Sequence, residues 1–244
     1  MTIARVLLGA SAYFFSGVAA SGDVSTYLPV NINPSLERDI ERLVVLGNIP
    51  NLTKPYSVAV VVRQLETIKN NYPKLYQRLN DGLQPYQSSA GLTHLRATLS
   101  DSDDSVAKPN AQGRTTEESI GVSVRGYWQP NGWVALSAGG ELTNEQLQVS
   151  GSLISLGRSW AQLDIGYKEL WLSPFNSSAQ MLSAQAQTLP SISLGASAPI
   201  EFWLLGVSYA FSVAQMSRQP TLYRDVYSDN KGPLLASVVL QLHP

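Results

Sequence analysis

The chain has 244 residues, a formal net charge of −1 and no cysteine, and only 14% of its residues are charged, against about 25% in a typical soluble domain. A mean hydropathy of −0.04 excludes a bundle of membrane-spanning helices, which would need several apolar stretches of about 20 residues. The lack of cysteine excludes a disulfide scaffold, a thiolate metal site and a cysteine nucleophile, and the near-neutral charge provides no basic surface for nucleic acid.

The first twenty residues have the pattern of a secretory signal peptide. Arg5 gives a positive start, residues 6–15 are apolar, and Val18, Ala19 and Ala20 are small residues suited to cleavage. The apolar stretch is shorter than the ~20 residues that a membrane span requires. We therefore expect residues 1–20 to be a signal peptide rather than a membrane anchor, and the remainder to be exported.

Residues 21–90 carry helical signals. Asn33 precedes a proline at a typical helix start, and Gly47 marks the end of the same apolar face. Ser57 can cap a second helix, and a third begins near Pro73. The pattern predicts three short amphipathic helices that form a small bundle.

From residue 91 onward the hydrophobic period changes to two. Alternation predicts strands over residues 119–128, 132–141, 146–156, 160–167, 203–213 and 234–242. A soluble β-sandwich also alternates, but most of these segments exceed the usual five or six residues, and strands of about ten with one apolar face are typical of transmembrane barrels. We predict a mainly β fold: an antiparallel transmembrane β-barrel over residues 91–244, preceded by the short N-terminal helical bundle.

The stretch over residues 100–118 is polar and begins with several acidic residues. Asp101, Asp103 and Asp104 would suit a calcium loop, but the glycine and the final glutamate of an EF-hand are not at their places. We expect a solvated loop here and no metal site.

Catalytic signals are weak. His94 could serve a serine triad, but no G-x-S-x-G motif precedes a helix. Glu141, Asp164 and Glu169 could supply the paired carboxylates of a glycosidase, although nothing in their spacing selects them. Asp164 and Lys168 share the small-residue face of one strand, where we expect them to pair. We predict no enzyme activity, no catalytic residue and no cofactor.

The most individual segment spans residues 166–194. A cluster of Trp171, Pro174 and Phe175 precedes a Ser-Leu-Ser-like stretch containing Ser183, and Pro190 opens the next strand. Together with the stretch from Tyr27 to Leu43, this segment resembles the capsule-assembly outer-membrane proteins of the Wzi type. The matching motif residues are Trp171, Ser183 and Pro190.

The resemblance implies a helical bundle on the periplasmic side of an outer-membrane β-barrel that holds capsular polysaccharide at the cell surface. The expected partners are capsular polysaccharide and outer-membrane lipid. Exposed residues of outer loops would bind the sugar, and the candidates are Trp128, Asn131, Trp133 and Trp171. The aromatic candidates suit a membrane-interface girdle equally well, and the Trp171 motif could be a folding element. The alternative functions are an outer-membrane porin or transport barrel, and a hydrolase that depends on His94.

The length sets a further expectation. The roughly 150 residues after Gly91 suffice for eight or so strands of about ten residues, fewer than the family's barrel contains. The chain is then either a truncated or short member, or a small barrel of its own. An incomplete barrel would need a second chain or an oligomer to cover its edges.

Overall fold

The structure, a computed structural model, describes residues 23–30, 33–49, 51–99, 120–143, 147–175, 187–202, 205–216 and 232–243. The expected signal peptide, the polar loop over 100–118 and the motif residue Ser183 lie outside these ranges.

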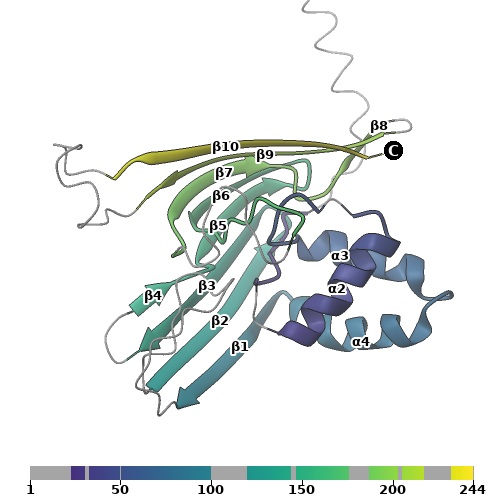
Figure 1. The fold of residues 1–244 in the computed structure, drawn as a ribbon, viewed down its shortest axis with the longest axis horizontal. Coiled ribbons are helices and arrows are strands. Elements are labelled where there is room, and N and C mark those ends of the chain that lie inside the picture. Colours follow the sequence, from purple (N-terminus) through teal and green to yellow (C-terminus); the bar gives the residue numbers. More distant parts are fainter. Residues whose placement is uncertain are drawn as a thin grey trace, which may run out of the picture.

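Within the described residues, three α-helices and one 3-10 turn form the N-terminal bundle (Figure 1). They are α2 (Pro34–Leu46), α3 (Val58–Ile68), α4 (Pro73–Leu83) and η1 (Gln84–Tyr86). The Asn33 side chain accepts hydrogen bonds from the backbone N–H groups of Ser35 and Leu36, and so satisfies donors that a helix start leaves free. The three predicted helices are confirmed.

The bundle has an apolar core built from one face of each helix. Its buried members are Leu28, Ile40, Leu43, Val44, Ile49, Val58, Val61, Leu65, Ile68, Leu75, Leu79, Leu83 and Tyr86. The charged side chains lie on the outer faces, where Arg78 and Asp39 join α4 to α2 by a two-armed ion pair of 2.7 and 2.9 Å.

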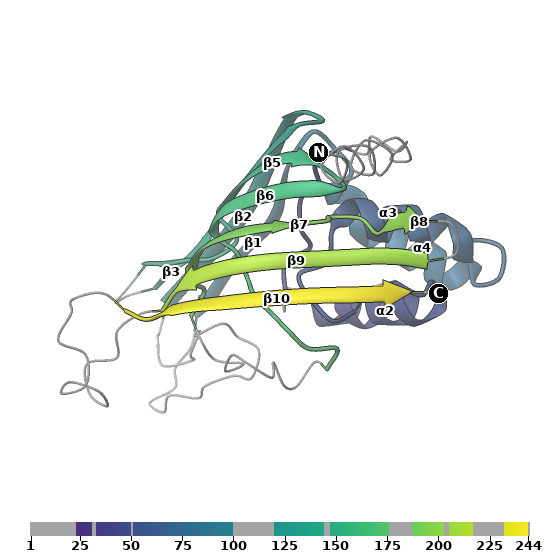
Figure 2. The ribbon, with the colours of Figure 1, turned by 90° about the horizontal axis from the view of Figure 1, so that it is seen from above.

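In the part of the chain that the structure describes, ten antiparallel strands form one curved sheet (Figures 1 and 2). They are β1 (Ala90–Leu99), β2 (Ile120–Asn131), β3 (Val134–Thr143), β4 (Leu147–Val149), β5 (Leu153–Arg158), β6 (Ala161–Tyr167), β7 (Pro190–Gly195), β8 (Ile200–Phe202), β9 (Leu205–Gln215) and β10 (Leu234–His243). The main path runs β1-β2-β3-β5-β6-β7-β9-β10, with β4 beside β3 and β8 beside β9. The mainly β, antiparallel prediction is confirmed, and within the described residues the sheet does not close, since β1 and β10 do not pair with each other.

The strand boundaries differ from the predictions at several places, of which two have a clear local cause, and β1 and β8 were not predicted. The strand expected over 146–156 is divided into β4 and β5 at Gly151, whose φ of +72° favours glycine. The strand β1 lacked a clear alternating pattern because a bulge lies between Leu92 and His94, and a bulge shifts the faces of the residues that follow it.

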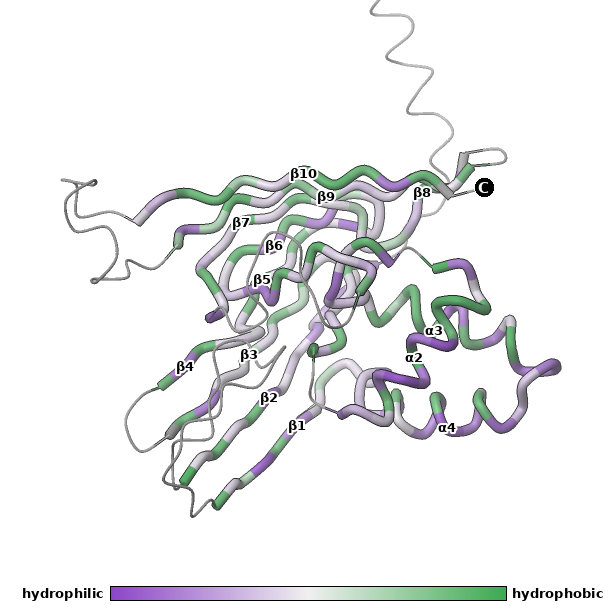
Figure 3. Tube along the Cα trace, in the orientation of Figure 1, coloured by the Kyte–Doolittle hydropathy of each residue, from purple (hydrophilic) through white to green (hydrophobic). Residues whose placement is uncertain are grey.

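The two faces of the sheet have opposite chemistry, visible as alternating colours in Figure 3. Small polar side chains are buried on the inner face, among them Ser123, Ser155, Gln162, Asp164, Ser191, Ser193, Ser212 and Ser237. Large apolar side chains are exposed on the outer face, among them Val122, Val124, Ile154, Ile165, Ile192, Leu194, Phe211, Val213, Val238 and Leu240. An apolar outer face that covers this many strands far exceeds the patches of an ordinary soluble monomer.

Among the described residues, no helix combines the length and the apolar character needed to cross a membrane.

Residues 23–30, which the sequence analysis grouped with the helices, lie along the inner face of the sheet. The Val24 N–H donates to the Gly132 carbonyl at 2.9 Å. The Ser25 N–H donates to Gln162 Oε1, and Gln162 Nε2 donates back to the Ser25 carbonyl, both at 2.9 Å. Because Leu28 joins the helical core, this segment connects the bundle to the interior of the sheet.

Candidate functional site in the interior of the sheet

A buried ion pair joins β2 to the segment that follows β6. The guanidinium of Arg125 contacts the carboxylate of Glu169, which also accepts hydrogen bonds from the Val30 N–H at 2.9 Å and the Ser150 hydroxyl at 3.0 Å. Burial raises the pKa of Glu169, but the charge of Arg125 and these hydrogen bonds outweigh it and hold the pKa below its ordinary value. Glu169 is therefore a buried carboxylate that stays ionised.

A second buried network surrounds Asp164 on β6. Lys168 forms the expected ion pair with Asp164, which confirms the pairing predicted from their shared face. The Tyr27 hydroxyl donates to Asp164 at 2.7 Å and Gln162 Nε2 donates at 2.8 Å. Burial, with the nearby Asp164 charge, raises the pKa of Tyr27 well above its ordinary value, so this phenol stays protonated. The two networks hold residues 23–30 and 168–169 inside the sheet.

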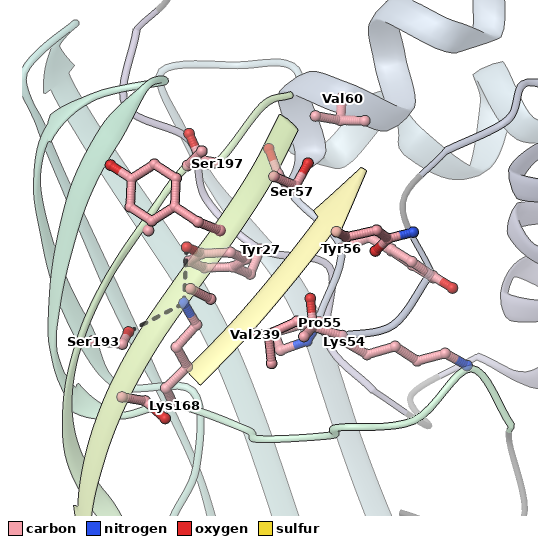
Figure 4. Close-up of a pocket in the computed structure, with 18 of the residues that line it drawn as sticks. Tyr27, Lys54, Pro55, Tyr56, Ser57, Val60, Lys168, Ser193, Ser197 and Val239 are labelled. Atoms are coloured by element: carbon pink, nitrogen blue, oxygen red, sulfur yellow. Dashed lines mark hydrogen bonds between the residues drawn. The ribbon is translucent and has the colours of Figure 1, made fainter. Parts of the chain in front are cut away.

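A cavity opens beside these networks, between the inner face and the loop that precedes α3 (Figure 4). Its volume is about 120 Å³, below the range of about 300–1,000 Å³ usual for ligand pockets, so it can hold only part of a large ligand. Its polar lining includes Tyr27, Lys54, Lys168, Ser193, Ser197, Ser208, Tyr209, Ser212, Ser237 and Gln241.

Hydroxyl and amide groups dominate this polar lining. Lys168 Nζ lies 4.1 Å from the centre of the Tyr27 ring and donates to the Ser193 hydroxyl at 3.3 Å (Figure 4). Gln241 Oε1 accepts from the Leu52 N–H at 3.4 Å. Hydroxyls both donate and accept, and phenol rings offer an apolar surface with a polar end. This combination suits a ligand rich in hydroxyl groups, such as a saccharide.

Trp171 does not lie in an exposed loop. Its side chain is only 1% exposed, and its indole N–H donates to the Phe175 carbonyl at 2.7 Å. Its backbone pairs with that of Lys54, through N–H···O contacts of 2.9 and 3.1 Å. The expectation of a sugar-facing Trp171 is wrong, because the indole is used to join the segment after β6 to the helical part. Its position supports the folding-element interpretation.

Trp128, Asn131 and Trp133 lie at the end of the sheet that carries the helices. Trp128 pairs with Ala90, which follows η1 by four residues. Asn131 Oδ1 accepts from the N–H groups of Trp133 and Val134 and so forms the turn between β2 and β3. We expected the helices in the periplasm and these three residues in outer loops. Both expectations cannot hold, because the residues lie at the same end of the sheet as the helices. Both indoles are exposed, as a membrane-interface girdle requires.

Three of the four candidate catalytic groups have polar or charged partners within the sheet. His94 Nε2 lies 2.8 Å from the Ser123 hydroxyl on the neighbouring strand. Asp164 and Glu169 each contact a cation, and Glu141 lies on β3. Among the described residues, no group of three or more histidine, aspartate or glutamate side chains could hold a metal ion.

Sequence reasoning missed the roles of Tyr27, Arg125 and Gln162. Arg125 and Gln162 do occupy the small-residue face of their strands, and a large polar side chain there is a usable signal for an interior contact. No sequence pattern indicated that Tyr27, 137 positions before Asp164, would bond to it.

Comparison with known proteins adds one informative likeness. No family model matches the chain, and no curated protein matches it in sequence. A solved structure of Wzi superposes on this chain with a TM-score of 0.59. The superposition covers 81% of this chain at 16% identity. Wzi is described as an outer-membrane protein involved in group 1 capsule assembly in Escherichia coli and as a carbohydrate-binding β-barrel. The match covers 46% of the Wzi chain, so this chain spans about half its length. The fold is Wzi-like.

Proposed function

We propose that this chain forms part of an outer-membrane β-barrel that binds capsular polysaccharide and retains it at the cell surface. The observation that carries the proposal is the reversed distribution of polarity in the sheet. Its outer face is apolar and exposed, and its inner face consists of small polar side chains, as a barrel in lipid requires. The Wzi-like fold supports the same location.

The polysaccharide-binding part of the proposal rests on the interior cavity rather than on the four residues expected from the sequence. Serine hydroxyls from β7, β9 and β10 converge there with Tyr27 and Gln241. Trp128 and Trp133 serve instead as interface anchors at the helical end, which in this orientation is the periplasmic end.

A porin or transport function is less well supported. Residues 23–30 and the segment after β6 lie inside the sheet and are held there by Asp164 and Glu169. An open pore needs a water-filled interior, so we expect the protein to show no solute conductance in planar bilayers. Steady single-channel conductance would favour the transport alternative.

The test uses a strain that lacks this chain and is complemented by variants. Without the protein, polysaccharide should move from the cell pellet to the medium while total synthesis is unchanged. Val239→Trp places a large ring in the cavity and should release polysaccharide in the same way. The control is Val238→Trp, since Val238 is 70% exposed on the opposite face of the same strand.

Both variants must reach the outer membrane in wild-type amounts, measured by immunoblot of membrane fractions. Equal attachment of polysaccharide in the deletion strain and the wild type would overturn the proposed function. If cells with the Val239→Trp variant retain polysaccharide at the wild-type level, the cavity is not the binding site.

A further inference from the structure

We propose that Arg158 and Trp133 bind the phosphate group of a membrane phospholipid at the helical end of the sheet. The inference rests on the outer-membrane location proposed above and goes beyond it, because it assigns one lipid contact to two named side chains. Three observations support it: the outward position of Arg158, its contact with the Trp133 ring, and its lack of a charged partner among the described residues.

Arg158 occupies the last outward position of β5, directly after a row of apolar side chains. The preceding Gly157 pairs with Gln162, which is fully buried on the inner face, and paired residues share a face. Because successive side chains of a strand alternate, Arg158 lies on the outer face. Ile154 and Leu156 lie on the same face and are 48% and 37% exposed. The cation is thus about 7 Å beyond the apolar Leu156 along the strand.

The surroundings of Arg158 are those of a membrane interface. Trp133 in the β2–β3 turn and Trp160 in the β5–β6 turn are 56% and 36% exposed, and both turns lie toward the helices (Figures 1 and 2). Tryptophan is enriched where hydrocarbon meets headgroups. Arginine lays its alkyl stem on apolar surface and keeps its charged head in the polar layer. That layer holds the phosphates of the phospholipids.

The Trp133 ring positions the head of Arg158. The guanidinium carbon lies over this ring, 3.8 Å from its centre, a contact that attracts a cation to the aromatic face. The guanidinium has five N–H donors, and those that do not point at the ring remain available to a ligand. A guanidinium fork matches phosphate oxygens and donates two parallel hydrogen bonds to them.

The charge of Arg158 is unbalanced in the part of the chain that the structure describes. Arg158 has no ion pair and no hydrogen bond there. In the described strands it is also the one lysine or arginine on the outer face, since Arg125 contacts Glu169 inside the sheet and Arg96 pairs with Ser123 of the inner face. A cation beside hydrocarbon is costly without a counter-charge, and the lipid phosphate is an anion at that depth.

The test measures lipid binding to the protein purified from outer membranes in a non-ionic detergent, by native mass spectrometry. The probes are dioleoylphosphatidylglycerol and dioleoylglycerol, which has the same acyl chains without the phosphate. We expect the wild type to bind the phospholipid at least about tenfold more tightly, because hydrogen bonds to a charged group contribute that much. Inorganic phosphate should not displace the lipid, since it lacks acyl chains that contact Leu156 and Ile154.

Two variants remove the site. Arg158→Gln should abolish the preference for the phospholipid, and Trp133→Leu should weaken it, because the ring no longer positions the arginine. Arg158→Lys keeps the charge without the fork and should keep part of the preference. The matched controls are Arg63→Gln, at an exposed arginine of α3, and Trp128→Leu, at an indole that is 54% exposed at the same end of the sheet. Both controls should bind as the wild type does.

Four results would overturn the inference. The wild type could bind the two lipids equally, Arg158→Gln could keep the wild-type preference, or inorganic phosphate could displace the lipid, which would mean a site for free anions. Loss of polysaccharide retention in Arg158→Gln cells with unchanged lipid preference would mean that this end binds saccharide instead.

All variants are compared at equal amounts in the outer membrane, measured by immunoblot. If Arg158→Gln does not reach the membrane, Arg158→Lys and Trp133→Leu carry the test. Absence of the wild-type protein from the outer membrane would overturn the proposed location and the inference with it. Wild-type polysaccharide retention together with any of the first three results would overturn the lipid site alone.

Discussion

The helical bundle and the sheet use the same apolar residue types in opposite places. In the described part of the bundle, thirteen apolar and aromatic side chains are buried against one another, while ions such as Arg78 and Asp39 face outward. In the sheet, serine, glutamine and ion pairs are buried, while isoleucine, leucine and valine are exposed. With the outer-membrane location proposed above, the difference follows from the surroundings: water favours an apolar interior, and lipid favours an apolar outer face.

From this comparison we predict that polar contacts stabilise the interior of the sheet, whereas apolar packing stabilises the bundle. Glu169→Ala leaves the Arg125 guanidinium buried without its carboxylate, which typically costs about 3–5 kcal/mol. The measurement is urea unfolding of the protein refolded in lipid vesicles. As control, the double variant Arg125→Met with Glu169→Leu removes both charges and should lose less than Glu169→Ala; an equal or greater loss would contradict an electrostatic role.

The bundle side of the comparison is tested at Leu79, which is fully buried in the helical core. Leu79→Ala should lower the stability of the bundle by about 2–5 kcal/mol, because it removes apolar contacts and leaves a cavity. The loss of helical circular dichroism on heating measures it. The control Val45→Ala on α2 alters a side chain that is 80% exposed and should leave the transition within about 0.5 kcal/mol.

The same substitution on the two outer surfaces distinguishes their solvents. Ile192→Arg on the sheet should cost about 2–4 kcal/mol if that face meets the middle of a bilayer. Val45→Arg on the bundle should stay within about 0.5 kcal/mol, since that face meets water. Unfolding from vesicles measures both variants. Equal, small effects would mean that the sheet also faces water and would break the comparison.

The smallest expected effect concerns the exposed pair between Arg78 and Asp39. The hydrogen bond from Arg78 lowers the pKa of Asp39 despite the opposing effect of burial. Because the folded pKa is the lower one, this pair stabilises the bundle above the ordinary aspartate pKa, about 3.9, and the benefit is lost as the pH falls through the folded value. Arg78→Ala should therefore lower the melting temperature slightly at pH 7.

At a pH below the folded pKa of Asp39, the melting temperatures of wild type and the Arg78→Ala variant should converge. A difference that is as large in acid as at neutral pH would show that Arg78 acts through packing of its alkyl chain and not through its charge.

Local signals predicted the elements well and the site poorly. The proline after Asn33, the serine at position 57 and Pro73 marked all three helices, because helix starts depend on neighbouring residues. Alternation located most strands for the same reason. The prediction for Trp171 was wrong because the local sequence around an aromatic residue after a strand does not tell whether its side chain is exposed or buried. Only its backbone pairing with Lys54, 117 positions away, decided that it is buried.

The sequence by itself determined the helical and extended segments, the two faces of each strand and the Asp164–Lys168 pair, all of which depend on residues a few positions apart. The tertiary structure alone decided that residues 23–30 enter the sheet, that Arg125 meets Glu169, and in which order the described strands pair from β1 to β10. These features join segments distant along the chain, and their positions follow from the curvature and strand order of the whole sheet, which no local pattern records.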